Sequence, residues 1–505
     1  MMISFGAGIG TGLWVGTGSA LAKAGPAGIA VTYTIMAGMV YLMFVSVGEM
    51  VRRMPFLPFA LALLGEISLI AASRQSMEYT DPAMGFANGI NYWFSWVMII
   101  PAEITACVSV LEFWPQTSVV PLAGWISIIL VLIIIPNLFH VKIYGHVEFY
   151  MSLVKCVTIL GMIMFMFIMA SGGIAATGGP LVFHYWKIPG GFHNGLKGIC
   201  ASFIQAAFSF GGGDYIAIIA PEVKEPRETV RATIGPLFWR MASFFVLNIW
   251  LVGMVVPYDD VDLINKSGTL ASPFVIAIKR AGIMPLAHVL NALIFLTVLS
   301  CGITSIYIAS RCLSGLSELK LIHPLFDKKD KAGRPYLALI VSTTLGGGLC
   351  YLNCNNTAAV VGIAGFIQYA LVYNNLIRFR MGLKAQGIDY KKLSFYSRCA
   401  PYLQYIGLVF IFLILAAEFY LSVFPFGAKP SASNFFASYL AAPLFVFDYF
   451  AYKWWFKTKI VKPIDMDFSA AAYFDYEEQC KAEEKMANPP PKLSLWKRVL
   501  AKVVG

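Results

Sequence analysis

Two glycine clusters interrupt long apolar segments about 200 residues apart in this chain of 505 residues. The first is GAGIGTG at residues 6–12 and the second is FGGG at residues 210–213. Each lies where a membrane helix would otherwise run unbroken. In lipid every backbone N–H and C=O needs a partner, so a helix unwinds only where protein or a wet cavity surrounds it. The clusters therefore indicate two places where the chain opens its backbone inside a membrane.

The composition supports a membrane location. Hydrophobic residues make up 58% of the chain, charged residues 13%, and the mean hydropathy is +0.70, which excludes a water-soluble protein of this size. About 20 apolar residues cross the hydrocarbon core of a bilayer. Twelve segments approach this length, near residues 3–21, 27–50, 86–110, 120–139, 148–170, 198–220, 235–257, 286–310, 336–352, 357–377, 402–424 and 435–456.

The basic residues are distributed unevenly between the two sides of the membrane. If the segments alternate in direction, 29 of the 38 lysines and arginines lie on the side of the N-terminus, 7 on the other side and 2 within spans. Basic loops stay in the cytoplasm, so we predict that both termini are cytoplasmic. The same bias explains the net charge of +11, and we expect the lipid bilayer, not nucleic acid, as the surrounding partner.

Motifs for enzymatic chemistry are absent from the sequence. The nine cysteines and six histidines show no metal-ligand spacing, and no G-x-x-x-x-G-K-[ST] string is present. We therefore expect no cofactor, no metal and no enzymatic activity. A membrane enzyme is the weakest interpretation, and an ATP-driven pump is also disfavoured.

The order of the segments predicts an all-α integral membrane protein with about twelve transmembrane helices. Five spans precede a long outer loop, five follow it and two remain, which fits a 5+5 inverted repeat with broken helices 1 and 6 plus two additional C-terminal helices. Paired interrupted helices point to the binding site of a secondary transporter. The predicted parts are a transmembrane domain at 1–456, with repeats at about 1–170 and 198–377 and helices 11–12 at 402–456, and a cytoplasmic tail at 457–505.

Two regions allow more than one interpretation. Residues 56–73 are unusually apolar for a connector and could form a re-entrant piece, an amphipathic connector or a gene-model artefact such as a retained intron. The end of the tail, LSLWKRVLAKVVG, has apolar residues at helical spacing. It could be an interfacial helix or a solvated segment.

The first glycine cluster has the properties of a carboxylate site. The amides of Gly10, Thr11 and Gly12 lie where the helix restarts, and a helix N-terminus attracts an anion through free N–H groups and its dipole. Glycine permits close approach because it lacks a Cβ. The alternative is that these glycines only allow close helix packing.

Longer motifs carry a resemblance to a known family. In order and spacing they resemble the fungal amino acid permeases of the amino acid–polyamine–organocation superfamily, over all but the tail and residues 56–73. The motifs include GAGIGTGLWVGTG, YTDPAMGFANGINYWFSW (79–96), NLFHVKIYGHVEFYMSLVK (137–155), FSFGGGDYIAIIAPEVKEPRETV (208–230) and GRPYLALIVS (333–342).

The resemblance implies a proton-coupled amino acid importer of the plasma membrane that works by alternating access. It implies that the substrate carboxylate meets the amides of Gly10, Thr11 and Gly12. It also implies that the α-amino group meets backbone carbonyls of the sixth span. These carbonyls belong to Phe208, Ser209 and Phe210.

Two departures from the family pattern are visible. The family carries a cytoplasmic tail before the first span, whereas here about five residues precede the break, as expected of a truncated gene model. The family's threonine-glutamate in the sixth span is replaced by Gly213-Asp214. The aspartate keeps the charge but has a shorter reach.

Ionisable residues within spans are functional candidates because a charge at bilayer depth is costly. Lys155 matches the lysine of the family motif and could bind the coupled proton, or it could form a permanent salt bridge. Glu103 could meet the substrate or a proton, or stabilise the bundle. Asp214 could take part in proton coupling or cap the restarted helix, and Glu49 is expected to pair or to snorkel.

Three further residues are candidates for the site. Phe208 and Phe210 could gate it or simply pack, and Thr304 could line the cavity. The function predicted from the sequence is amino acid:proton symport. The alternatives are transport or exchange of another amine, such as choline, GABA or a polyamine, and a non-transporting amino acid sensor of the same fold.

Overall fold

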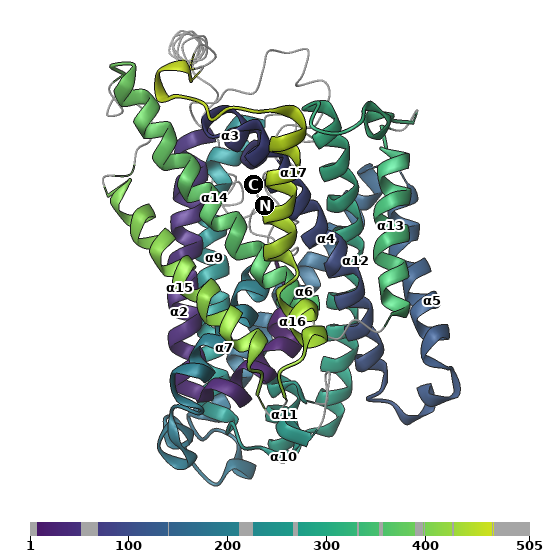
Figure 1. Cartoon of the computed structure of the whole chain (residues 1–505). Coiled ribbons are helices and arrows are strands. Elements are labelled where there is room, and N and C mark those ends of the chain that lie inside the picture. The colour runs from purple at the N-terminus through teal and green to yellow at the C-terminus, as the bar shows by residue number, and fades with distance from the viewer. Residues whose placement is uncertain are drawn as a thin grey trace, which may run out of the picture.

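The structure is a computed structural model, and it is helical throughout the residues that it describes. These are residues 8–51, 69–139, 141–211, 226–265, 271–330, 333–352, 357–388, 397, 399–426, 429–466 and 468. No strand occurs among them, and the helices form one elongated bundle (Figure 1). The predicted all-α class is confirmed.

Each predicted apolar segment overlaps a helix. The main helices are α2 (Thr17–Val51), α4 (Pro82–Leu111), α5 (Leu122–Ile134), α6 (Val141–Ala170), α7 (Gly195–Phe210), α9 (Pro226–Val255), α12 (Met284–Glu318), α13 (Tyr336–Tyr351), α14 (Thr357–Ala385), α15 (Tyr402–Val423), α16 (Ala432–Tyr439) and α17 (Ala441–Phe456). By length and composition seven helices of the described chain could cross a membrane, or eight if the bent pair α16–α17 is one span. The count of twelve therefore stays a prediction.

Helix α2 contains two of the predicted segments. At Gly25 the backbone turns out of the helix with φ 77° and ψ 170°. Glycine is required at this positive φ, and a Cβ there would lie 2.8 Å from the carbonyl oxygen of Gly191. Ala27 N–H donates to that same oxygen at 2.8 Å, which braces the turn. The first apolar segment therefore ends at Gly25 and the second begins directly after it.

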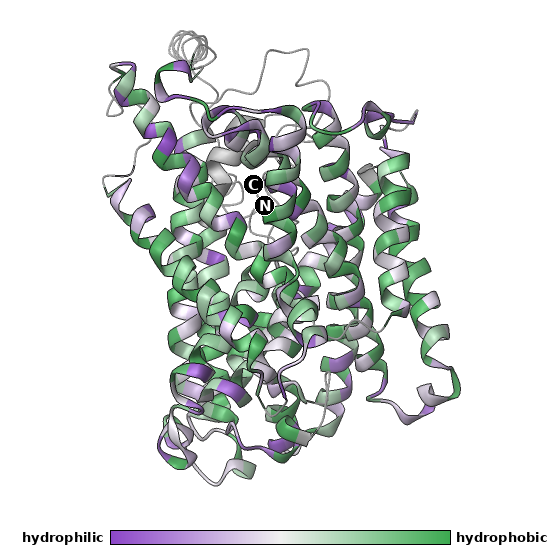
Figure 2. Ribbon diagram, viewed as in Figure 1, coloured by the Kyte–Doolittle hydropathy of each residue, from purple (hydrophilic) through white to green (hydrophobic). Residues whose placement is uncertain are grey.

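Apolar side chains cover the outside of the bundle as well as its interior. Helices α4 and α12 pack together, and α2 packs against α7 and α9. On the periphery, the side chains of Phe412 on α15 and Trp454 on α17 are 72% and 80% exposed. Figure 2 shows hydrophobic residues along the helices and hydrophilic ones mainly at the two ends. This pattern suits a protein surrounded by lipid.

One end of the bundle carries the short helix α3 (Leu69–Tyr79) and is called the α3 end here. The chain after α17 returns across this end and contacts it. Val461 N–H donates to the Thr80 carbonyl at 2.9 Å, and the Arg378 side chain on α14 donates to the carbonyls of Tyr79 and Val461. The start of the predicted tail is thus held against α3 and α14. Its predicted terminal helix lies outside the described residues.

The connector at residues 56–73 is described only in part. Residues 69–73 belong to α3, and the remainder lies outside the described residues. In α3 the side chains of Ser73, Gln75 and Ser76 are buried. Ser76 receives a hydrogen bond of 2.9 Å from Asn375 on α14. The described part of this connector is therefore a helix that is packed through polar side chains.

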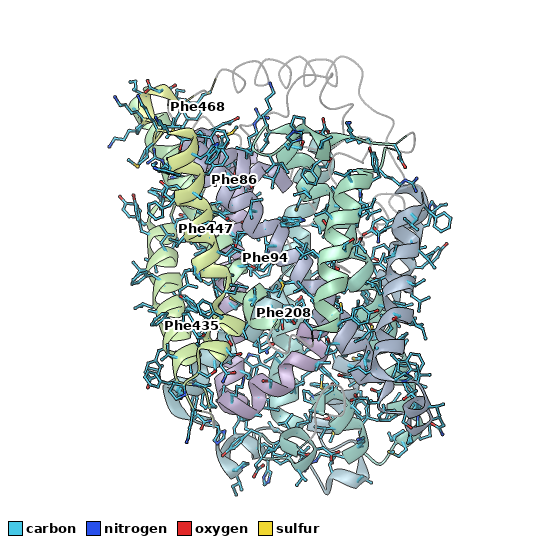
Figure 3. The ribbon with its side chains drawn as sticks, turned by 45° about the vertical axis from the view of Figure 1, so that its right-hand side comes forward. Phe86, Phe94, Phe208, Phe435, Phe447 and Phe468 are labelled. Atoms are coloured by element: carbon cyan, nitrogen blue, oxygen red, sulfur yellow. The ribbon has the colours of Figure 1, made fainter. Side chains whose placement is uncertain are left out.

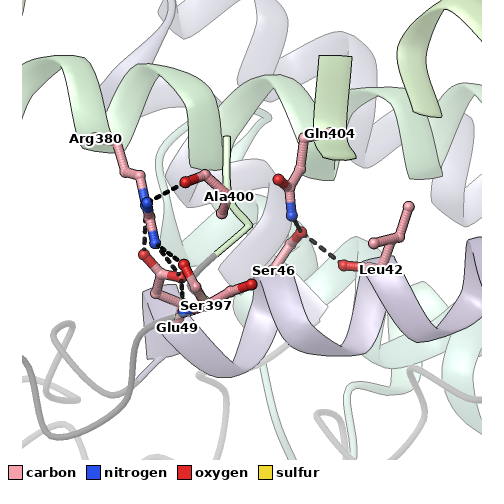
Figure 4. A network of polar contacts seen from close by, with 7 residues as sticks. All are labelled: Leu42, Ser46, Glu49, Arg380, Ser397, Ala400 and Gln404. Atoms are coloured by element: carbon pink, nitrogen blue, oxygen red, sulfur yellow. Dashed lines mark hydrogen bonds and ion pairs between the residues drawn. The ribbon is translucent and has the colours of Figure 1, made fainter. Parts of the chain in front are cut away.

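A buried ion pair joins α2 to α14 near the α3 end (Figure 4). Arg380 donates to both carboxylate oxygens of Glu49, Nε to Oε1 at 2.8 Å and Nη2 to Oε2 at 3.0 Å. The Glu49 side chain is fully buried, and Ser397 N–H also donates to it at 3.0 Å. The predicted pairing of Glu49 is confirmed.

Candidate functional site

The helix after the first glycine cluster restarts where the sequence predicts. Its first turns are η1 (Gly12–Gly16), a short π-helix that follows Thr11 and continues into α2. Gly10 and Gly12 are buried, whereas Thr11 keeps partial exposure. Trp14 N–H donates to the Gly10 carbonyl at 3.5 Å and closes the first turn. The helix N-terminus is therefore located at the glycine cluster.

A carboxylate of the protein itself occupies this helix N-terminus. Glu103 on α4 accepts a hydrogen bond of 2.6 Å from Thr11 Oγ1, and the backbone N–H of Thr11 donates to it as well. Glu103 also hydrogen-bonds Cys301 on α12, and its side chain is only 2% exposed. A Cβ on Gly10 would lie 2.8 Å from Cys301 Sγ and 3.0 Å from Glu103 Oε1. The glycine cluster, Glu103 and Cys301 thus form one compact site.

The last turn of α7, directly before the second glycine cluster, lies beside the first cluster. Helix α7 ends at Phe210, and Gly211 leaves the helix with φ −57° and ψ 151°. A Cβ on Gly12 would lie 2.7 Å from Ser209 Cα and 2.9 Å from Ser209 N, so the two backbones touch. Ser209 Oγ also shares a hydrogen bond of 3.0 Å with the Tyr33 hydroxyl on α2. The start of η1 and the last turn of α7 therefore face each other, as the paired breaks predict.

The two phenylalanines at this end of α7 differ in environment. Phe210 is 1% exposed, and its ring packs against Phe245 on α9 at 5.0 Å and Tyr33 at 6.1 Å. These contacts support a packing role for Phe210. Phe208 keeps partial exposure and lies midway along the bundle (Figure 3). A gating role stays a prediction for Phe208.

Sequence reasoning missed Gln205, one turn before Ser209. Its amide oxygen is buried and has no hydrogen-bond partner among the described residues. A Cβ on Gly16 would lie 2.6 Å from this oxygen, so the side chain points at the start of the first helix. A buried acceptor without a partner is costly. The only available signal was a lone amide side chain in an apolar helix.

A second polar cluster surrounds Lys155 on α6. Lys155 is fully buried, and its Nζ lies 3.8 Å from Oε1 of Glu148, which is also fully buried. Ser300 Oγ lies 2.9 Å from both oxygens of Glu148 and donates to this carboxylate. This ion pair agrees with the salt-bridge interpretation of Lys155. The coupling interpretation requires in addition that Lys155 exchanges a proton. Sequence reasoning missed Glu148 as a candidate.

Thr304 faces this second cluster. It is fully buried, hydrogen-bonds Glu148, and lies 3.3 Å from the Tyr144 hydroxyl on α6. Cys301, one turn earlier on α12, is the residue that reaches Gly10. The predicted cavity-lining role of Thr304 therefore fits less well than a contact with Glu148. Asp214 and Gly213 lie outside the described residues, and no group of three potential metal ligands occurs in the described part of the chain.

These features define a multi-pass membrane protein in which the end of α7 meets the start of η1, where a carboxylate of the protein itself is bound. The chain belongs to the amino acid permease family, whose sequence profile matches residues 1–464. The resemblance stated from the motifs is confirmed. Members of this family are transporters, so the expectation that the chain is not an enzyme is confirmed as well.

Curated relatives are amino acid transporters of fungi. The chain is 36% identical to cationic amino acid transporter 1 of Schizosaccharomyces pombe, across 95% of this chain and 81% of the relative. It is 34% identical to general amino-acid permease GAP1 of Saccharomyces cerevisiae, across 98% and 83%. It is also 34% identical to amino acid transporter 1 of S. pombe, across 94% and 82%.

Proposed function

We propose that this protein imports amino acids across the plasma membrane together with protons, by alternating access and without covalent chemistry. The observation that carries the proposal is the carboxylate of Glu103 at the N–H and hydroxyl of Thr11. A helix N-terminus that already holds one carboxylate has the donors to hold another. The family of the chain supports the amino acid as substrate.

The substrate would bind between the two breaks. Its carboxylate would displace Glu103 from Thr11, and its ammonium group would meet carbonyls in the last turn of α7, where the helix dipole is negative. This last turn includes Ser209, whose backbone lies against Gly12. A zwitterion with adjacent charges suits two helix ends that touch. Gln205 and Phe208, both partly exposed, would contact the rest of the substrate.

Proton coupling would follow from competition between two carboxylates. Glu103 and a substrate carboxylate cannot share the Thr11 donors while both are charged, because like charges repel strongly in a buried site. A protonated Glu103 removes this repulsion, so substrate binding would favour proton uptake. Lys155 interacts electrostatically with Glu103 and would accept the proton during transport.

The orientation in the membrane follows from the basic side chains. Lys329, Arg334 and Lys457 lie beyond the helix ends near α3, and Arg311 and Arg380 lie within about two turns of the ends of α12 and α14. Basic residues favour the cytoplasmic side, so the α3 end would face the cytoplasm. Both termini would then be cytoplasmic.

Uptake of radiolabelled amino acids by a permease-deficient yeast tests the proposal. A panel of amino acids would identify the substrates, with choline, GABA and a polyamine as comparison compounds. Uptake should fall as external pH rises and should collapse when a protonophore is added. Flux that is insensitive to both would contradict proton coupling, and uptake of the comparison amines alone would contradict the substrate class.

A further inference from the structure

Two helices of the bundle present facing rows of polar side chains. The rows repeat at intervals of three, four or seven residues, so each occupies one face of its helix. We call the two rows together the polar column. It consists of Tyr144, Glu148 and Lys155 on α6 and Ser300, Thr304 and Tyr307 on α12.

Contacts connect the column from one member to the next. Lys155 Nζ lies 3.8 Å from Glu148, and Glu148 hydrogen-bonds both Ser300 and Thr304. Thr304 Oγ1 lies 3.3 Å from the Tyr144 hydroxyl. Every side chain of this series is buried. The series therefore links a buried ammonium group to a phenol through groups that can carry a proton.

The column opens at the α3 end. The rings of Tyr144 and Tyr307 stack at 4.1 Å and 5°, and the guanidinium of Arg311 lies 3.5 Å over the Tyr307 ring. Both tyrosines line a pocket together with Asn137, Arg311 and Arg334. The stacked tyrosines thus separate the buried carboxylate from this pocket, and the Tyr144 hydroxyl bridges toward Thr304.

The other end of the column reaches the candidate substrate site. Lys155 interacts electrostatically with Glu103 and with Glu148. The elements packed against α6 are α9, α12 and the short η4 (Ile135–Leu138), which carries no ionisable side chain. From α9, Arg240 acts on Cys156 next to Lys155, and α12 contributes Ser300 and Thr304. Lys155 therefore interacts with both the carboxylate at the substrate site and the carboxylate of the column.

We propose that the polar column is the path by which the coupled proton leaves the substrate site for the cytoplasm, with Glu148 as its carrier. The proposal rests on the proton-coupled transport proposed above. Ionisable chains inside membrane proteins serve as proton relays because isolated buried charges are too costly to keep without a function.

The transfer balances at each step. Lys155 gives a proton to Glu148, so an N–H bond breaks, an O–H bond forms, and a neutral amine faces a neutral acid. Glu148 then passes the proton to Thr304, whose hydroxyl passes its own proton to Tyr144. Tyr144 likewise gives its proton to water in the pocket, and Glu148 returns to the carboxylate. The neutral Lys155 amine then takes the next proton from Glu103, so an O–H bond breaks, an N–H bond forms and the ammonium group is restored.

Substituting Glu148→Gln in the full chain tests the carrier, because glutamine keeps an acceptor for Ser300 but cannot carry the proton. The measurements are net proton-driven uptake and substrate exchange in proteoliposomes, with an amino acid identified by the uptake panel. A transporter that cannot release its proton to the cytoplasm can still exchange a bound substrate molecule for another one. We expect net uptake to fall at least about tenfold while exchange stays within about twofold.

Conservative variants along the column separate its role from folding. Tyr144→Phe and Thr304→Val should also lower net uptake more than exchange. The matched controls are Tyr150→Phe, a 64% exposed tyrosine of the same helix, and Thr297→Val, whose hydroxyl donates to the Leu293 carbonyl within α12. Both controls should keep net uptake unchanged. Protein abundance in the membrane, read from a fluorescent fusion, corrects for folding.

The possible outcomes distinguish the path from the proposed function. If the wild-type protein moves no protons with its substrate, the proposed coupling fails and the path fails with it. If the wild type is coupled but Glu148→Gln and Tyr144→Phe retain normal net uptake, only the path is overturned. Equal loss of uptake and exchange in Tyr144→Phe, at normal abundance, would also overturn it.

Discussion

The backbone of Gly12 in η1 lies directly against the backbone of Ser209 in α7. A Cβ added to Gly12 would approach Ser209 Cα to 2.7 Å, a distance that real side chains do not reach. Because the obstacle is backbone, it cannot rotate away. The contact therefore fixes the separation between the positive end of one helix and the negative end of another.

Gly12→Ala should abolish most amino acid uptake, because its methyl group would push the two helix ends apart. The reduction should reach at least about tenfold, since misplacing a binding group by 1 Å has effects of this size or larger. Gly38→Ala on α2 is the matched control, because a Cβ at Gly38 meets nothing within 4 Å. Uptake assays with membrane abundance as the reference would measure both. Normal uptake by Gly12→Ala would show that the substrate site does not depend on the contact between Gly12 and Ser209.

Gly10→Ala should also reduce uptake, but its obstacle is a side chain. The new methyl group would lie 2.8 Å from Cys301 Sγ. The double substitution Gly10→Ala with Cys301→Ala removes the sulfur and should restore part of the uptake. Cys301→Ala alone is the reference for the double variant, because it removes the same sulfur and its hydrogen bond with Glu103. If uptake by the double variant does not recover, the contact of the new methyl group with Glu103 accounts for the loss instead.

Lys155→Ala should uncouple or stop transport and should also destabilise the protein. It leaves the buried carboxylate of Glu148 without its cation, which costs about 3–5 kcal/mol in buried pairs. The double variant Lys155→Ala with Glu148→Gln removes both charges and should regain stability without regaining coupled uptake. Thermal unfolding in detergent measures the first effect, and pH-dependent uptake measures the second. A wild-type pH profile in either variant would assign coupling to another residue.

Arg380→Ala should lower stability strongly, because the buried Glu49 would lose its bidentate partner. The expected cost is again about 3–5 kcal/mol. Arg74→Ala is the comparison, since Arg74 pairs with Glu78 one turn away and is 30% exposed. Such a helical pair contributes only about 0.3–0.5 kcal/mol. Similar melting temperatures for the two variants would contradict the assigned role of the Glu49 pair.

Acid should weaken the α3 end through Asp81. Burial opposes ionisation, but hydrogen bonds from Lys453, Thr458 and the Ala83 N–H hold the pKa of Asp81 below its ordinary value of 3.8. A lowered folded pKa stabilises the protein above the ordinary pKa, and this contribution is lost as the pH falls through the lower value. Asp81→Asn should lack that acid-dependent step. Melting temperatures across this acidic range would detect it, and identical profiles would argue against Asp81.

The sequence predicted the helices better than the contacts between them. Hydropathy located the apolar segments, and the glycine cluster located the start of the helix at Gly12. It could not predict that Thr11 binds Glu103, because these residues are 92 positions apart and only the folded bundle brings the start of η1 to α4. Contacts of this kind depend on how the bundle assembles, which no local pattern records.

Glu148 was missed for a physical reason. The predicted fifth segment begins at this residue, so Glu148 falls at the edge of the segment. The structure begins α6 at Val141 and places Glu148 about two turns inside the helix. Its spacing of seven residues from Lys155 was the available signal, because two such residues share one helix face.

The chain that leaves α17 is fastened to α3 and α14 by Arg378, which grips the carbonyls of Tyr79 and Val461 together. A label attached after residue 468 would leave this attachment in place, whereas a truncation before residue 457 would remove Val461 and with it the attachment. A protein that binds the region beyond residue 468 would therefore transmit force to α3 and α14 before it could displace α17.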